Sequence, residues 1–199
     1  MVNLTPQKLS QVARSKITPA ELVYSFEAAH ADTVIGPKLS ERSTNEIINL
    51  AEDTAKQRRY QFDGDIESVV GKMAGLVASK DMWRTGNKSS VVVSCEGDFV
   101  VAVSNRGSFR ENTFDLAMGV GHRMLHVDSA VSDKHMVVPR YCDDDDKAAK
   151  QAMIFAVNFL APKAEVQRRL DEGTGLNEIS GQMVIDQHFI EQQIKQFQL

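Results

Sequence analysis

Cysteine is scarce in this chain of 199 residues, which contains only Cys95 and Cys142. The two lack the C-x-x-C spacing of redox motifs and of cysteine zinc sites. Small secreted domains that depend on disulfides carry a higher density of cysteine than this. The sequence therefore predicts two reduced thiols and argues against a cysteine-based metal centre.

Long hydrophobic runs are lacking as well. No apolar segment approaches the roughly 18 residues of a membrane-spanning helix, so we expect no membrane insertion. Residues 1–18 alternate charged and polar positions too often for a signal peptide, which predicts a cytoplasmic protein. With 42% hydrophobic residues, the chain can still bury the core of one medium-sized domain with an extension.

An excess of positive charge is also missing, since 23 Lys and Arg stand against 27 Asp and Glu. Residues 1–40 are nearly neutral, far from the basic surface that phosphate binding requires. The cluster Lys56-Gln-Arg-Arg59 ends an expected helix, where cations meet the negative end of the helix dipole. The acidic excess lies from Asp143 onward, which favours a protein partner or simple solubility over direct nucleic-acid binding.

The first 42 residues are expected to form an N-terminal helical extension. Thr5-Pro6 and Thr18-Pro19 each place a threonine N-cap before a proline at the first helical position, which predicts two short helices. Such a pair is also found in helix-turn-helix DNA binders, but the weak basic charge favours packing or partner docking. A Gly-Pro pair within residues 35–43 predicts the linker to the main domain.

Residues 43–199 predict an α+β domain. Apolar residues at helical spacing predict helices over 43–59, 66–77 and 147–160, with further helices towards the C-terminus. The β-branched segments Ser90–Cys95 and Phe99–Ser104 are joined by Glu-Gly-Asp, which indicates a hairpin. Two strands alone are marginally stable, so we expect a small antiparallel sheet that packs on helices or gains a third strand.

The stretch from Phe109 to His126 is the expected central helix. Its apolar residues recur at steps of three and four, which places them on one helix face: Phe114, Met118, Gly121 and Leu125. His122 and His126 lie one turn apart, so their imidazoles are neighbours and could share a metal ion. Histidines at this spacing are also common as buried structural residues, and the pair alone leaves both alternatives open.

Two motifs in succession resemble a known family. The central helix reads R-x-x-x-F-x-L-A-x-x-x-G-H-x-x-L-H, and the helix from Lys147 reads A-x-x-F-A-x-x-x-L-x-P. With the preceding strands, this order resembles the ImmA/IrrE family of small zinc metallopeptidases over roughly residues 47–199. The resemblance implies a zincin-like central helix, with zinc held by two of its histidines and by a glutamate of the later helix.

Most of the family's zinc chemistry is missing from the matching positions. The resemblance places the second zinc histidine on His122, the first on Met118, the catalytic glutamate on Gly119 and the glutamate ligand on Gln151. A zinc peptidase needs three suitable ligands and a carboxylate that takes the proton of the zinc-bound water. A thioether, a bare glycine and a neutral carboxamide supply none of these, so the scaffold is kept while the catalytic residues are replaced.

Nearby residues could rebuild a metal site. His126, His135 and Asp128 lie on or just after the central helix, and with His122 they would make a set of histidines and one carboxylate that zinc accepts. Without a carboxylate at Gly119 such a metal would be structural. We expect no cofactor from the sequence, and zinc is the metal that these residues could bind.

Two functions follow from the resemblance. The first is a non-catalytic, protease-like regulator from a phage, mobile element or bacterial stress locus, which binds a protein such as a helix-turn-helix repressor. The second is an active zinc metallopeptidase with a rearranged site that cleaves a transcriptional repressor. The degenerate positions favour the first, and the sequence fixes neither the partner nor the oligomeric state.

Overall fold

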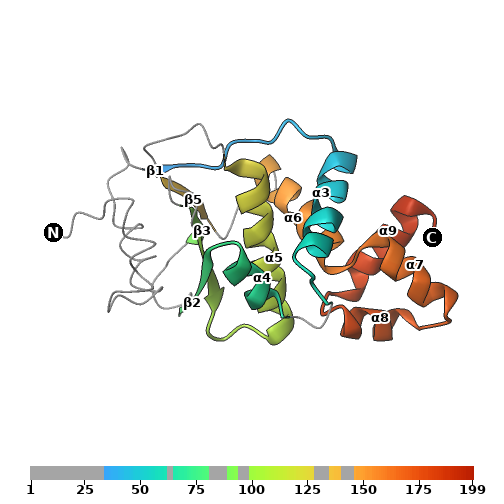
Figure 1. Cartoon of the computed structure of the whole chain (residues 1–199). Coiled ribbons are helices and arrows are strands. Elements are labelled where there is room, and N and C mark those ends of the chain that lie inside the picture. The colour runs from blue at the N-terminus through green and yellow to red at the C-terminus, as the bar shows by residue number, and fades with distance from the viewer. Residues whose placement is uncertain (1–33, 62–64, 81–88, 94–98, 128–134, 140–145) are drawn as a thin grey trace.

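The structure is a computed structural model that describes residues 34–61, 65–80, 89–93, 99–127, 135–139 and 146–199. Within these ranges the chain forms helices and one mixed sheet (Figure 1). The elements follow in the order β1 Val34–Ile35, α3 Thr44–Gln57, α4 Ile66–Lys72, β2 Gly75–Lys80, β3 Ser89–Val93, β4 Phe99–Ser104, α5 Phe109–His126, β5 His135–Pro139, α6 Lys147–Leu160, α7 Lys163–Asp171, α8 Leu176–Gln182 and α9 Gln187–Phe197.

The sheet has the strand order β1-β5-β3-β4-β2. Strand β3 pairs antiparallel with β4 on one side and with β5 on the other, which confirms the predicted hairpin. The edge pairs, β2 with β4 and β1 with β5, are parallel. The expected antiparallel sheet is therefore wrong in this detail, because β1 adds to β5 and β2 adds to β4, each running parallel to its neighbour.

The helix predicted over residues 66–77 is also too long. Helix α4 ends at Lys72, and Ala74 takes a left-handed conformation with φ of 59°. Strand β2 then begins at Gly75 and pairs along its whole length with β4. The apolar residues at 73, 76 and 77 fit a helical period, but pairing with a fully buried neighbouring strand determines their structure instead.

Helix α5 lies between the sheet and the helices α3 and α6 (Figure 1). It meets the sheet through Gly119, where an added Cβ would lie 2.5 Å from Val101 Cγ2 on β4. It meets α6 through Gly121, where an added Cβ would lie 3.1 Å from the carbonyl oxygen of Ala152. The two glycines thus allow α5 to approach the sheet and α6 closely, which brings its histidines next to α6.

The helix starts follow the sequence signals. Ser108 caps α5 and forms a capping box with Glu111, and Ser43 does the same for α3 with Glu46. Asp146 caps α6, since its Oδ1 accepts from the backbone N–H groups of Ala148 and Ala149. These caps satisfy amide groups that a helix leaves without partners at its N-terminus.

The last three helices form the right-hand end of the molecule in Figure 1. Gln193 of α9 is buried, and its Nε2 donates to Asn158 Oδ1 at 3.0 Å and to the carbonyl of Ala161 at 2.8 Å. These bonds fix α9 to the end of α6. Within the described ranges, no helix is long and apolar enough to cross a bilayer.

Several sequence predictions lie outside the described residues. They concern the two helices within residues 1–33, both cysteines, Asp128 and the acidic run before Asp146. Of the predicted extension, residues 34–42 are described, and they contribute β1 to the sheet of the main domain.

Candidate functional site

Two histidines of α5 form the centre of the candidate site. His122 and His126 are 2% and 3% exposed, and their Nδ1 atoms lie 2.9 Å apart. The step of four residues places the rings on one helix face, as the sequence predicts. Burial of two imidazoles requires that their ring nitrogens find partners, so the contacts around the pair decide what it can do.

Gln151 of α6 supplies the next contact. Its Oε1 lies 3.2 Å from His126 Nε2 and also accepts from the backbone N–H of Ser40 at 3.1 Å. Its Nε2 donates to the carbonyl oxygen of Ser40 at 2.8 Å. One side-chain amide of α6 therefore links α5 to Ser40, which lies 111 residues before Gln151 in the sequence.

These contacts determine where the protons of the pair lie. Because Gln151 Oε1 can only accept, the neutral His126 carries its proton on Nε2. The Nδ1 of His126 is then an acceptor, and it accepts from the Nδ1–H of His122. A directed chain of hydrogen bonds thus runs from His122 through His126 and Gln151 to the backbone of Ser40.

The environment keeps both imidazoles neutral. Burial, together with the proximity of His126, lowers the pKa of His122 to about 3, although the Asp146 carboxylate acts in the opposite direction. Burial also lowers the pKa of His126, against the hydrogen bond to Gln151 and the charge of Asp146. Asp146 is a charged neighbour of the pair that the sequence analysis did not select.

The positions that the resemblance assigns to zinc chemistry fall in different surroundings. Met118 is half-buried and packs with the hydrophobic core. Gly119 lies against Val101, so this backbone has no room there for a glutamate side chain. Gln151 does lie at the histidine pair, but it contacts His126 rather than His122.

A second alignment follows from the geometry. The pair that actually meets reads His122-Arg123-Met124-Leu125-His126, which matches the zinc motif H-E-x-x-H except that Arg123 stands at the glutamate. The motif's glutamate acts as the general base, and arginine cannot accept a proton. Neither alignment supplies a carboxylate for that role.

The donor set does not fit zinc in this arrangement. Each Nδ1 atom of the pair is engaged in an N–H···N bond, and two nitrogens on one tetrahedral zinc would lie about 3.3 Å apart rather than 2.9 Å. Gln151 contacts the opposite nitrogen of His126, so its oxygen does not face the same point as the two Nδ1 atoms. Among the described residues, no group of three or more His, Cys, Asp or Glu could hold a metal ion.

The two other residues proposed for a rebuilt metal site are not placed in full by the structure. Asp128 is outside the described residues, and for His135 only the backbone is described, at the start of β5. Ser40 is a site residue that sequence reasoning missed. Its contact with Gln151 uses only main-chain atoms, so no local sequence pattern could have indicated it.

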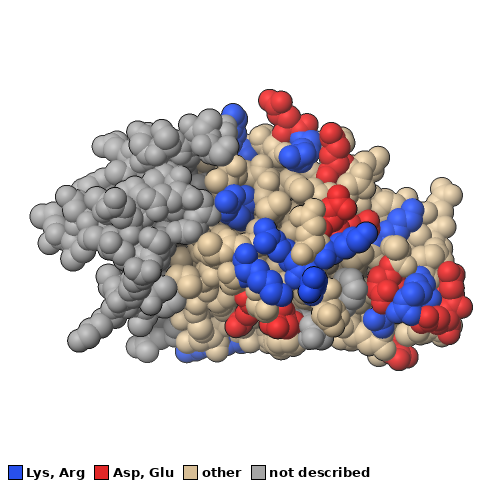
Figure 2. Space-filling model, viewed as in Figure 1, with Lys and Arg blue, Asp and Glu red and all other residues tan. Residues whose placement is uncertain are grey.

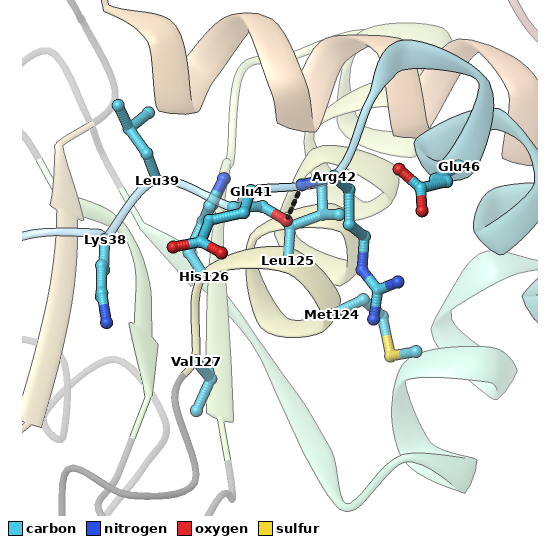
Figure 3. A pocket seen from close by; sticks show the side chains of 10 residues that line it. Lys38, Leu39, Glu41, Arg42, Glu46, Met124, Leu125, His126 and Val127 are labelled. Atoms are coloured by element: carbon cyan, nitrogen blue, oxygen red, sulfur yellow. Dashed lines mark hydrogen bonds between the residues drawn. The ribbon is translucent and has the colours of Figure 1, made fainter.

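A pocket of about 460 Å³ lies beside the pair (Figure 3). One wall is the last turn of α5 and the residue after it, and the other is the segment that contains Ser40. It is lined by Lys38, Leu39, Ser40, Glu41, Arg42, Glu46, Met124, Leu125, His126 and Val127. Charged residues of both signs line it together with apolar residues, so the pocket favours neither a simple anion nor a simple cation.

Basic side chains gather over α4 and the end of α3 (Figure 2). There Arg58 Nη1 donates to the carbonyl of Lys72 at 3.3 Å, and Lys72 Nζ donates to the carbonyl of Arg58 at 3.3 Å. Each cation thus binds a backbone carbonyl at the other helix's C-terminal end. This agrees with the predicted role of the cluster at helix ends and adds no argument for nucleic-acid binding.

Comparison with known proteins yields neither a matching family model nor a matching curated protein.

Proposed function

We propose that this protein is a non-catalytic, metallopeptidase-like regulator that acts in the cytoplasm by binding a protein partner. In this proposal α5 corresponds to the zinc-binding helix of a zincin-like scaffold and has lost its catalytic groups. The partner class suggested by the sequence resemblance is a helix-turn-helix repressor of a phage, a mobile element or a bacterial stress locus.

The hydrogen-bonded chain from His122 to Ser40 carries this proposal. A working zinc site needs unprotonated nitrogens that face one point and a carboxylate that activates water. In this chain the two Nδ1 atoms share a proton, and a carboxamide stands where the resemblance expects a carboxylate. A buried, neutral and internally bonded pair is an arrangement that stabilises the fold rather than one that turns over a substrate.

Metal content and peptidase activity test the loss of catalysis. We expect the protein purified without chelator to retain less than stoichiometric zinc, and a denatured protein substrate to stay intact when zinc is added. His122→Ala should then change neither result, and the exposed His188 gives the matched control, His188→Ala. Stoichiometric zinc and cleavage that both disappear in a folded His122→Ala protein would contradict the proposal.

The length of a repressor that is isolated in complex with this protein distinguishes a regulator that only binds from an active peptidase. A regulator that only binds should release its repressor at full length from a complex isolated from the native host. The active peptidase instead predicts repressor fragments that accumulate with time. Mass spectrometry of the complex after incubation with zinc measures this difference directly.

A further inference from the structure

An extended segment of the chain lies across the candidate site. Strand β1 pairs in parallel with β5, in the register Val34 with His135 and Ile35 with Met136. Residues 36–42, here called the strap, continue without helix or strand to the Ser43 cap of α3. In Figure 1 the strap runs from the edge of the sheet past the ends of α5 and α6 to α3.

The strap is bound at Ser40 through its main chain. One amide, that of Gln151, accepts from the Ser40 N–H and donates to the Ser40 carbonyl. This is the pairing that a neighbouring β-strand would offer to an extended residue. The strap's other described contacts leave Lys38, Leu39, Glu41 and Arg42 exposed, with Leu39 at 47%. At Ser40 the strap is therefore held through backbone atoms.

The amide of Gln151 is held ready for this role. His126 Nε2–H bonds the same Oε1, and His126 is in turn fixed by His122. The buried pair thus determines which end of the amide accepts and which donates. Because the Gln151 side chain is already fixed, it loses little conformational entropy when it binds a new main chain.

The adjoining pocket has room for side chains of a bound segment. Met124, Leu125 and Val127 at the end of α5 line one side of it, and Figure 3 shows Arg42 above Met124 on the strap side. Strap residues themselves form the second wall. Displacement of the strap would extend the pocket to Gln151, which binds the strap at Ser40.

We propose that the position taken by the strap, between β5, Gln151 and the end of α5, is a binding site for an extended peptide segment of a partner protein. The strap occupies this site in cis, and the partner's segment replaces it, with its main chain on Gln151 and an apolar side chain in the pocket. The proposal rests on the proposed function, for which it names the partner-binding surface. Its ligand class is set by main-chain pairing, as in peptides that add to a sheet edge.

A strap that can be exchanged tests the site without knowledge of the partner. The full chain receives a specific protease site between Arg42 and Ser43, so that cleavage frees the strap while Ser43 still caps α3. The probe is a fluorescent peptide of residues 34–42, and its anisotropy reports binding to the cut protein. Circular dichroism confirms that every cut protein remains folded.

We expect saturable peptide uptake by the cut protein and none by the uncut chain. The Ser40→Pro peptide lacks the N–H that Gln151 accepts, so it should bind at least about tenfold more weakly. The Ser40→Ala peptide keeps this N–H and should bind within about threefold of the original. In the protein, Gln151→Leu should weaken uptake about tenfold, whereas Gln182→Leu, at an exposed position of α8, should leave it unchanged.

Three results would overturn the proposal: no uptake by folded, cut protein at excess peptide, equal binding of the Ser40→Pro peptide, or equal uptake by Gln151→Leu. None of these depends on the partner or on metal. A full-length repressor captured from the host together with failed peptide uptake would leave the proposed function standing and place its surface elsewhere. Peptide uptake by a protein that cleaves its repressor would instead support the binding site and contradict the proposed non-catalytic function.

Discussion

Gly119→Glu is expected to prevent folding, and Gly119→Ala to lower the free energy of unfolding by about 2 kcal/mol. An alanine Cβ at this position would lie 2.5 Å from Val101 Cγ2 and 2.8 Å from Cγ1. Carbon atoms in contact normally stand about 3.5–4.0 Å apart. Val101 is fully buried in β4 and β-branched, so its side chain cannot rotate away without loss of packing.

Helix propensity works in the opposite direction and is the smaller effect. Replacement of a helical glycine by alanine contributes up to about 1 kcal/mol. Gly181 in α8 is the matched control, since an added Cβ meets no atom within 4 Å there. Gly181→Ala should therefore stabilise the protein, while the same change at Gly119 destabilises it. Urea unfolding of both variants measures the difference.

A double-mutant cycle identifies the cause. If the clash with Val101 is responsible, the destabilisation caused by Gly119→Ala should be smaller by at least about 1 kcal/mol in a Val101→Ala background. Equal effects in the two backgrounds, or a Gly119→Ala protein as stable as Gly181→Ala, would contradict this explanation. The result also bears on the proposed function, because it measures how well this backbone accepts a side chain at position 119, where the resemblance places a catalytic glutamate.

Much of the helical framework was predictable from local signals. The sequence predicts α5 and α6 with the boundaries that the structure has, because apolar residues recur at helical spacing along each of them. Strand β2 was missed because its apolar residues also fit a helical period. Its pairing with β4 is a long-range contact that no local pattern encodes.

The site was predictable only in part for the same reason. The proximity of His122 and His126 follows from helix geometry, and the resemblance indicates that Gln151 lies near them. The contact between Gln151 and Ser40 depends on how residues 36–42 cross the domain. The steric role of Gly119 depends on one valine of a neighbouring strand, and a glycine in a helix does not reveal its neighbours.

Acid is expected to destabilise the protein through the histidine pair, starting well above the range where carboxylates titrate. The pKa of His122 falls from 6.5 in the unfolded chain to about 3 in the folded protein. The unfolded state therefore binds more protons below pH 6.5, so the stability present above that pH is lost as pH falls towards 3. For His122 alone the loss between pH 7.5 and 5 is about 2 kcal/mol.

The structural cause is the single proton between the two rings. If His126 becomes charged, its new proton sits on Nδ1, so both Nδ1 atoms carry hydrogen and face each other across 2.9 Å. If His122 becomes charged, its new proton sits on Nε2 and places a charge on a buried ring. His126, whose pKa is also lowered, adds to the same loss, and the carboxylate of Asp146 opposes it. The slope near pH 5.5 should thus lie between about 0.9 and 1.8 protons, or about 1.2 to 2.5 kcal/mol per pH unit.

Urea unfolding at several pH values between 7.5 and 5 measures this slope. The double variant His122→Leu/His126→Leu removes both titrating groups and should show a nearly flat profile over the same range. His188→Gln removes an exposed histidine and should keep the slope of the natural chain. A double variant that loses stability with pH as steeply as the natural protein would show that the pair is not what titrates. That result would contradict the assignment of both histidines as neutral members of the hydrogen-bonded chain to Ser40.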